Sequence, residues 1–242
     1  MTELSIIIRT KNEERWISHC LESVFSQEIK SIEVIIVDNN SSDNTVEIAK
    51  RYPIKKVVNI LDFFPGRAIN LGIKHSVGKY IVCLSAHCIP KDKYWLSNLR
   101  KNLDDPSVAG VYGRQVPVTF TSSVDKRDLF LTFGLDRRVQ TKDYFFHNAN
   151  SMFRRSIWEE YPFDEEVTNI EDRVWGKLVT DLGFSIIYEP DATVFHHHGL
   201  HQSNDQRRLN GVIKIIEELD PSLKSELPVS LHPKNSEVSA II

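Results

Sequence analysis

The stretch IEVIIVDNNSSDNT, residues 32–45, decides the fold class of this chain. It opens on a run rich in β-branched residues, which is typical of a buried strand, and continues into a polar cluster typical of a turn. Ser42 or Asp43 can then cap a helix that carries Val46 and Ile48. The stretch therefore predicts a strand, a loop and a helix in immediate succession.

The same alternation extends to both sides of this stretch. Strands are predicted at residues 4–8, 57–60 and 80–84, and helices at residues 13–25 and 67–76. This order indicates βαβ units and a parallel sheet, whose ligands bind beyond the carboxyl ends of the strands. We therefore expect three segments to meet in one crevice: Arg9-Thr10, Asp38 and Ser85-Ala86-His87.

The second half of the chain is less regular. The pattern predicts helices at residues 93–103, 155–161, 171–182 and 205–219, and strands at residues 108–112, 184–188 and 192–195. Residues 119–144 are expected to form a partly helical insertion or a flap that gates the acceptor. We expect one α/β domain over residues 1–218, with a nucleotide-binding half at 1–115 and an acceptor half at 116–218. Residues 219–242 are expected to be a poorly ordered tail.

Bulk properties exclude several classes of protein. A chain of 242 residues suits one large domain, and its net charge of -3 gives no general attraction to nucleic acid. Three scattered cysteines without a C-x-x-C pair are against a disulfide framework or a zinc ribbon. The sequence opens without a secretory signal pattern and has no long apolar run. We expect a cytoplasmic protein, with peripheral attachment to the inner face of the membrane left open.

Three motifs point to a known family. They are IRTKNE at residues 8–13, VDNNSSDNT at 37–45 and GRAINLG at 66–72. Their order resembles the inverting glycosyltransferase family 2, which has the GT-A fold, over residues 4–200. The resemblance implies a Rossmann-like, mostly parallel sheet flanked by helices. It also implies transfer of a sugar from a nucleotide-sugar donor to a glycan or lipid-linked glycan hydroxyl, with inversion, in surface-polysaccharide synthesis.

The resemblance implies a donor site at the strand ends. An Asp such as Asp38 can accept hydrogen bonds from the base or ribose, and the alternative is an Asp that only shapes its turn. Arg67 could reach a pyrophosphate from the start of its helix, and Arg154 could contact phosphate; a solvated surface role is the alternative for both. The expected donor-binding residues are Arg9, Thr10, Glu13, Asp38, Arg67, Asn70, Ser85, Ala86, His87 and Arg154.

One motif departs from the family. Where the family has Leu-Asp-x-Asp, whose carboxylates hold a divalent cation, this chain has LSAHC at residues 84–88. A hydroxyl and an imidazole suit Mg²⁺ poorly, although histidine suits Mn²⁺ or Zn²⁺. His87 with His196 and His198, which alternation puts on one side, could form a nitrogen-rich metal site. The alternative is that these histidines bind phosphate or line the pocket without a metal. Little or no dependence on Mg²⁺ is expected.

The catalytic base is also assigned by resemblance. The segments NANSMFRR (148–155), FDE (163–165) and ED (171–172) follow the family's order of landmarks. Asp172 is then the base that deprotonates the acceptor hydroxyl, with Glu171 beside it, at a helix N-terminus that favours the ionised form. The alternative is that both are ordinary first-turn helix residues. Acceptor contacts are expected from His147, Asn150 and Trp175, with core packing the alternative for Trp175.

Three rival functions differ in class. One is a catalytically inactive relative that binds nucleotide or glycan, which the lost carboxylates favour and the retained ED pair opposes. A second is a sugar nucleotidyltransferase, which the absence of a Gly-rich triphosphate loop near the first strand opposes. A third is a metal-storing or sensing protein built on the histidine triplet at residues 196–198. The donor base, the sugar, the acceptor and the oligomeric state are not specified by the sequence.

Overall fold

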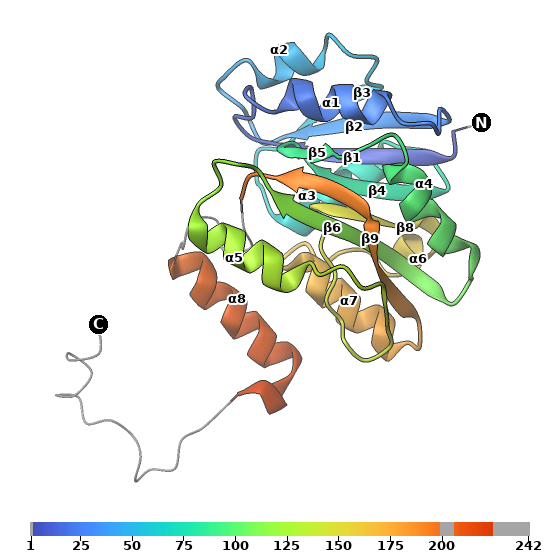
Figure 1. The fold of residues 1–242 in the computed structure, drawn as a ribbon, viewed down its shortest axis with the longest axis vertical. Helices are drawn as coiled ribbons and strands as arrows, with labels where there is room; N and C mark the ends of the chain where they lie inside the picture. Colours follow the sequence, from blue (N-terminus) through green and yellow to red (C-terminus); the bar gives the residue numbers. More distant parts are fainter. Residues whose placement is uncertain (1, 199–205, 225–242) are drawn as a thin grey trace, which may run out of the picture.

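A computed structural model describes residues 2–198 and 206–224. Within these residues, nine strands form one sheet in the order β3-β2-β1-β4-β8-β6-β9-β5, with β7 paired to β9 (Figure 1). The strands are β1 (Leu4–Thr10), β2 (Ile32–Asp38), β3 (Lys56–Asn59), β4 (Tyr80–Ser85), β5 (Cys88–Pro90), β6 (Val108–Pro117), β7 (Arg138–Gln140), β8 (Asn150–Arg154) and β9 (Ser185–His196). The helices are α1 (Ile17–Phe25), α2 (Thr45–Ala49), α3 (Pro65–Lys74), α4 (Trp95–Arg100), α5 (Ser123–Thr132), α6 (Arg155–Glu160), α7 (Glu171–Asp181) and α8 (Gln206–Leu219).

The first half of the chain has the predicted βαβ arrangement. β1 pairs in parallel with both β2 and β4, and β2 pairs in parallel with β3. Successive side chains of a strand point to opposite faces, so Ile6 and Ile8 join one hydrophobic cluster and Ile7 joins the other. At the start of α2, the Asp43 carboxylate accepts a hydrogen bond from the Thr45 backbone N–H at 3.0 Å. Helices cover both faces of the sheet, which confirms the α/β class (Figure 1).

The second half makes the sheet mixed rather than mostly parallel. β8 is antiparallel to both β4 and β6, and β5 and β7 are antiparallel to β9. β9 is one strand of twelve residues where the sequence predicts two, because its pairing with β6 continues past Pro190 through an irregularity between Gly113 and Gln115. This continuity carries His196 to the same edge of the sheet as the ends of β1 and β4.

The segment 119–144 is partly helical, as expected. It contains α5 and the short strand β7, and its Leu129 and Phe133 side chains are buried in the core. Phe130 and Leu131 are exposed on the same helix. The gating role of this segment stays a prediction.

The chain beyond Leu219 is described only as far as a 3₁₀ turn at Pro221–Leu223 and the residue after it. Most of the expected tail, residues 225–242, therefore lies outside the described residues. In the described part of the chain, no helix combines the length and the apolar character needed to cross a membrane.

Candidate active site

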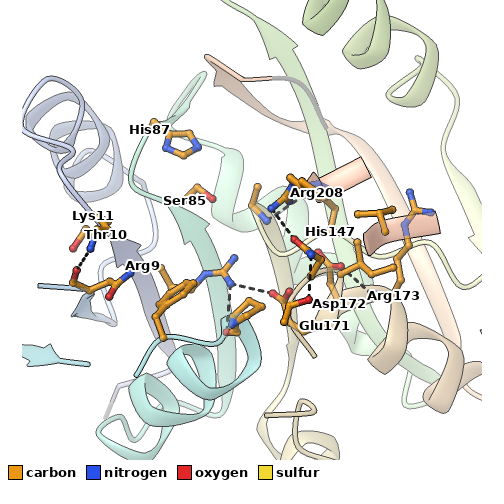
Figure 2. Close-up of a pocket in the computed structure, with 18 of the residues that line it drawn as sticks. Arg9, Thr10, Lys11, Ser85, His87, His147, Glu171, Asp172, Arg173 and Arg208 are labelled. Atoms are coloured by element: carbon orange, nitrogen blue, oxygen red, sulfur yellow. Dashed lines mark hydrogen bonds and ion pairs between the residues drawn. The ribbon is translucent and has the colours of Figure 1, made fainter. Parts of the chain in front are cut away.

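A cavity of about 380 Å³ opens beyond the carboxyl ends of β1 and β4, where the sequence predicts a crevice (Figure 2). Its wall combines strand ends, the N-terminus of α7 and one side of α8. The lining residues are Arg9, Thr10, Lys11, Glu13, Asn39, Phe63, Pro65, Ser85, His87, His147, Ala149, Thr168, Asn169, Ile170, Glu171, Asp172, Arg173, His196, Arg208 and Val212.

Glu171 and Asp172 form the acidic part of this cavity. They occupy the first turn of α7, and both side chains are largely buried. The Asp172 carboxylate accepts hydrogen bonds from the backbone N–H groups of Asn148 and Arg173, each at 2.9 Å. Burial raises the pKa of both carboxyl groups above their ordinary values, and the neighbouring Asp172 charge raises the pKa of Glu171 further. The site thus holds a carboxylate that accepts protons more readily than an exposed one.

The residue before this pair has an unusual backbone. Ile170 adopts φ 49° and ψ 36°, in the left-handed region that a β-branched residue rarely enters. Such conformations cost about 1–3 kcal/mol and concentrate at functional sites. Here the turn starts α7 so that its first two carboxylates line the cavity.

Arg9 connects the strand edge to the acidic pair. Its Nη1 donates to Glu171 Oε1 at 3.0 Å and to the Pro65 carbonyl at 3.4 Å, and its side chain is 20% exposed. Figure 2 shows the guanidinium extending across the cavity from the end of β1 toward α7. Arg9 therefore lies in the predicted crevice. Its contact with Glu171 could not be inferred from the sequence.

Histidines form the opposite wall. His87 Nδ1 lies 2.7 Å from Glu13 Oε1, and the His87 ring contacts the rings of His196 and His198 at centroid distances of 5.0 Å each. His196 Nδ1 lies 2.7 Å from Gln115 Oε1. Burial lowers the pKa of His196 well below its ordinary value, so this imidazole is neutral at physiological pH.

The arrangement of these rings does not fit a shared metal ion. The His87 and His196 rings are stacked with an angle of 3° between their planes. The nitrogen lone pairs of two parallel stacked rings lie in two separate parallel planes, whereas two ligands of one ion must converge on a point about 2 Å from each nitrogen. Among the residues that the structure describes, no group of three or more His, Cys, Asp or Glu side chains could hold a metal ion. The expected grouping of His87, His196 and His198 is therefore present, but as packed rings.

His147 lines the cavity near the acidic pair, as its expected acceptor role requires. Its Nδ1 accepts from the Ala149 backbone N–H at 3.3 Å and lies 3.0 Å from Gln115 Nε2. Burial, helped by the nearby charge of Arg173, lowers the pKa of His147 to about 3. A neutral imidazole at this position can donate or accept a hydrogen bond but carries no charge.

Thr10 and Asp38 lie at the nucleotide side predicted for the strand ends. The Thr10 hydroxyl donates to Asp38 Oδ1 at 2.8 Å, and Asp38 also accepts from the hydroxyl and the backbone N–H of Ser41. Asp38 is only 5% exposed and does not line the cavity, whereas Thr10 and Asn39 do. In the structure Asp38 therefore shapes its turn, as the alternative interpretation proposes. The contact of Asp38 with a nucleotide stays a prediction.

Several expected site residues lie elsewhere because other parts of the fold bind their polar groups. Asn70 bonds to the Phe163 carbonyl and the Trp158 indole, and Asn150 bonds to the Trp95 indole and the Ala192 carbonyl. Arg154 donates to backbone carbonyls of residues 103, 105 and 108. Besides Asp38, the expected donor and acceptor residues that do not line the cavity are Arg67, Asn70, Ala86, Asn150, Arg154 and Trp175.

Three of these residues lie outside the cavity for simple reasons. Arg67 pairs with surface carboxylates, Asp62 among them, so its charge is already compensated outside the cavity. Ala86 is fully buried in the core. Trp175 is 1% exposed and its indole donates to the Tyr161 carbonyl at 2.9 Å, which is the core-packing alternative.

Six basic or polar lining residues were not predicted: Lys11, Asn39, Thr168, Asn169, Arg173 and Arg208. Lys11 donates to the Asn39 carbonyl at 3.0 Å, and Arg208 of α8 donates to Asn169 Oδ1 at 3.1 Å. Arg173 directly follows the ED pair, so its position in the sequence could have pointed to it. Arg208 lies almost two hundred residues from β1, and no local signal links it to the strand ends.

Comparison with known proteins identifies a family that this chain matches. The family model described as Glycosyl transferase family 2 matches residues 5–161. O-antigen chain rhamnosyltransferase RfbN of Salmonella typhimurium is 25% identical over 209 residues, which are 81% of this chain and 67% of that protein. Glycosyltransferase AglE of Haloferax volcanii is 28% identical over 206 residues, which are 80% of this chain and 66% of that protein. The chain thus spans about two thirds of the length of these relatives.

Two solved structures have a similar fold. The mannosyltransferase PcManGT from Pyrobaculum calidifontis, in complex with GDP-Man and Mn²⁺, has a TM-score of 0.68 and 22% identity, covering 93% of this chain and 66% of that one. S. aureus TarS 1-349 has a TM-score of 0.65 and 17% identity, covering 98% of this chain and 77% of that one. At these identities the likeness supports the GT-A fold alone.

Proposed function

The chain belongs to glycosyl transferase family 2, and from that premise we propose that it transfers a sugar from a nucleotide-sugar donor to a hydroxyl of a glycan or lipid-linked glycan, inverting the anomeric centre. The observation that carries this proposal is the buried Glu171-Asp172 pair, which lines the same cavity as the carboxyl ends of β1 and β4. Ligands of open α/β sheets bind at such ends. The name of RfbN, an O-antigen chain rhamnosyltransferase, supports a role in surface-polysaccharide synthesis.

In this mechanism Asp172 is the base. It accepts the proton of the acceptor hydroxyl while that oxygen attacks the anomeric carbon and the nucleotide leaves from the opposite side. Hydrogen bonds from two backbone N–H groups and the N-terminus of α7 hold the carboxylate in place. Of the residues that line the cavity, we expect His147 to contact the acceptor and Thr10, Lys11 and Asn39 to contact the nucleotide.

The first test is binding of the leaving nucleotide. UDP, GDP, dTDP, CDP and CMP are screened by thermal unfolding, each with EDTA, Mg²⁺, Mn²⁺ or Zn²⁺. Saturation at about a hundredfold above Kd stabilises the folded state by about 2.7 kcal/mol, which for a chain of this size raises the Tm by about 5–10 °C. One nucleotide is expected to give this shift and the others a smaller one. An unchanged Tm under every condition would contradict a nucleotide-sugar donor.

The pH dependence of transfer tests the base. Because burial raises the pKa of Asp172 and Glu171, each carboxyl is protonated at a higher pH than an ordinary one. A base must be ionised, so kcat/KM is expected to fall with decreasing pH through a midpoint above the ordinary carboxyl value of about 4. The measurement is kcat/KM from pH 4 to 9, with thermal unfolding over the same range as the control for stability. A rate that stays flat down to pH 4 would exclude a buried carboxylate base.

A further inference from the structure

In the resembled family a metal ion binds at the carboxyl end of the strand that corresponds to β4. In this chain the positively charged Arg9 side chain lies beside that position. By the sequence resemblance, Ser85 and His87 stand where that family has the metal-binding carboxylates. The stacked rings of His87 and His196 do not converge on an ion. Arg9 of β1 is the register partner of Ser85 of β4, so the two residues lie side by side on neighbouring strands. The Arg9 guanidinium therefore extends from a position next to Ser85, the first residue that departs from the family motif.

The Arg9 side chain has the chemistry to bind phosphate. A guanidinium carries five N–H donors in a planar fork that matches phosphate oxygens. Both hydrogen bonds that Arg9 makes within the described residues come from Nη1, so its Nε and Nη2 donors have no hydrogen-bond acceptor there. Figure 2 shows this side chain between Ser85 and His87 on one side and Glu171 on the other.

The charge around Arg9 favours an anion over a metal ion. Lys11, Arg173 and Arg208 line the same cavity, and its three carboxylates already have partners. Glu171 is bound by Arg9, Glu13 by His87, and Asp172 by two backbone N–H groups. A divalent cation beside Ser85 would be repelled by the Arg9 charge and would find no free carboxylate ligand on β4. A phosphate at the same place gains charge-assisted hydrogen bonds.

We propose that Arg9 replaces the metal ion, and that its guanidinium binds the phosphate of the leaving nucleotide directly. The same side chain holds Glu171, so one cation neutralises the leaving group and fixes the acidic pair at the correct distance from it. This inference rests on the proposed function, because it requires a nucleotide in the cavity. Its consequence is binding of a nucleoside diphosphate without a divalent cation.

The test measures binding rather than turnover. The nucleotide that gives the largest thermal shift is titrated calorimetrically into the wild-type chain and the variants Arg9→Met and Arg9→Lys, in EDTA and in Mn²⁺. The wild type is expected to bind with a Kd that Mn²⁺ changes by less than about twofold. Loss of charge-assisted hydrogen bonds in Arg9→Met weakens binding in EDTA by about ten- to a hundredfold. Arg9→Lys is expected to be intermediate, because an ammonium keeps the charge without the fork.

Two controls separate phosphate binding from a structural role. Arg51→Met removes an exposed arginine outside the cavity and should leave the Kd unchanged. The matching nucleoside carries no phosphate, so Arg9→Met should leave its thermal shift unchanged. Equal losses of nucleoside and nucleotide binding, an unaltered Kd in Arg9→Met, or wild-type binding only with Mn²⁺ would each overturn the inference while leaving the proposed function standing. Failure of the wild type to bind any nucleotide would instead overturn the proposed function.

Discussion

Replacing Asp172 by Asn is expected to lower kcat for sugar transfer by about 10²–10⁴-fold, the contribution typical of a positioned general base. An amide has nearly the volume of the carboxylate but cannot accept the proton of the acceptor hydroxyl at any useful pH. The backbone N–H groups of Asn148 and Arg173 fix the group at this position, so the side chain oxygen of Asn can keep one of these bonds. The measurement is the initial rate of nucleotide release with donor and acceptor saturating.

Asp181→Asn, on the exposed end of the same helix, is the matched control and should keep wild-type activity. The Kd for the donor nucleotide should also stay within about twofold in Asp172→Asn, because the carboxylate acts on the acceptor side. Retention of more than about a tenth of the wild-type rate by Asp172→Asn would remove Asp172 from the role of base. If Glu171→Gln were the inactive variant instead, the base would be Glu171.

Local composition was enough to predict the first half of the fold. Runs of β-branched residues such as IEVIIV and LSIII produce strands buried on both faces, and the helices between them follow from apolar spacing. β8 escaped prediction because NSMFR begins with polar residues, and the burial of Asn150 depends on a distant partner, the Trp95 indole that donates to its side chain. The Ser151 hydroxyl donates to the nearby Asn148 side chain. Its antiparallel position between β4 and β6 is a tertiary property that periodicity does not encode.

Site residues were predictable where the position of the backbone, such as a strand end, determines where they lie. They were less predictable where the location depends on the hydrogen-bond or ion-pair partner of a long side chain. The rule for strand ends brought Arg9, Ser85 and His87 to one cavity, and the family landmarks brought Glu171 and Asp172. Arg67 was expected there because its charge lies at the start of a helix, and Arg154 because its charge could contact phosphate. Each instead bonds acceptors that lie nearer to its own backbone, on the protein surface or on β6 and the turn before it. Arg208 could not be foreseen, because only the folded chain brings α8 to the cavity.

Trp175 shows most clearly how the structure decides between two roles that the sequence leaves open. From the sequence, an indole one turn after Asp172 suits either a sugar platform or the core. In the structure its ring packs against Phe146, Phe153 and Phe163 at centroid distances of 5.2, 5.4 and 5.5 Å. No face of this ring is left for a sugar, because the side chain is almost fully enclosed.

Trp175→Ala is therefore expected to lower the free energy of unfolding by about 3–5 kcal/mol, the usual cost of removing a buried aromatic side chain. The Tyr161 carbonyl would also lose its hydrogen bond from the indole. Since such domains are stable by about 5–15 kcal/mol, urea denaturation should show a large fall in the midpoint with a similar m-value. Trp175→Leu refills much of the volume without an aromatic ring and should cost less, which separates packing from the loss of an aromatic platform. If Trp175→Ala unfolded at the wild-type midpoint while acceptor KM rose, the side chain would have to face the acceptor, and the packing of its ring against Phe146, Phe153 and Phe163 would be wrong.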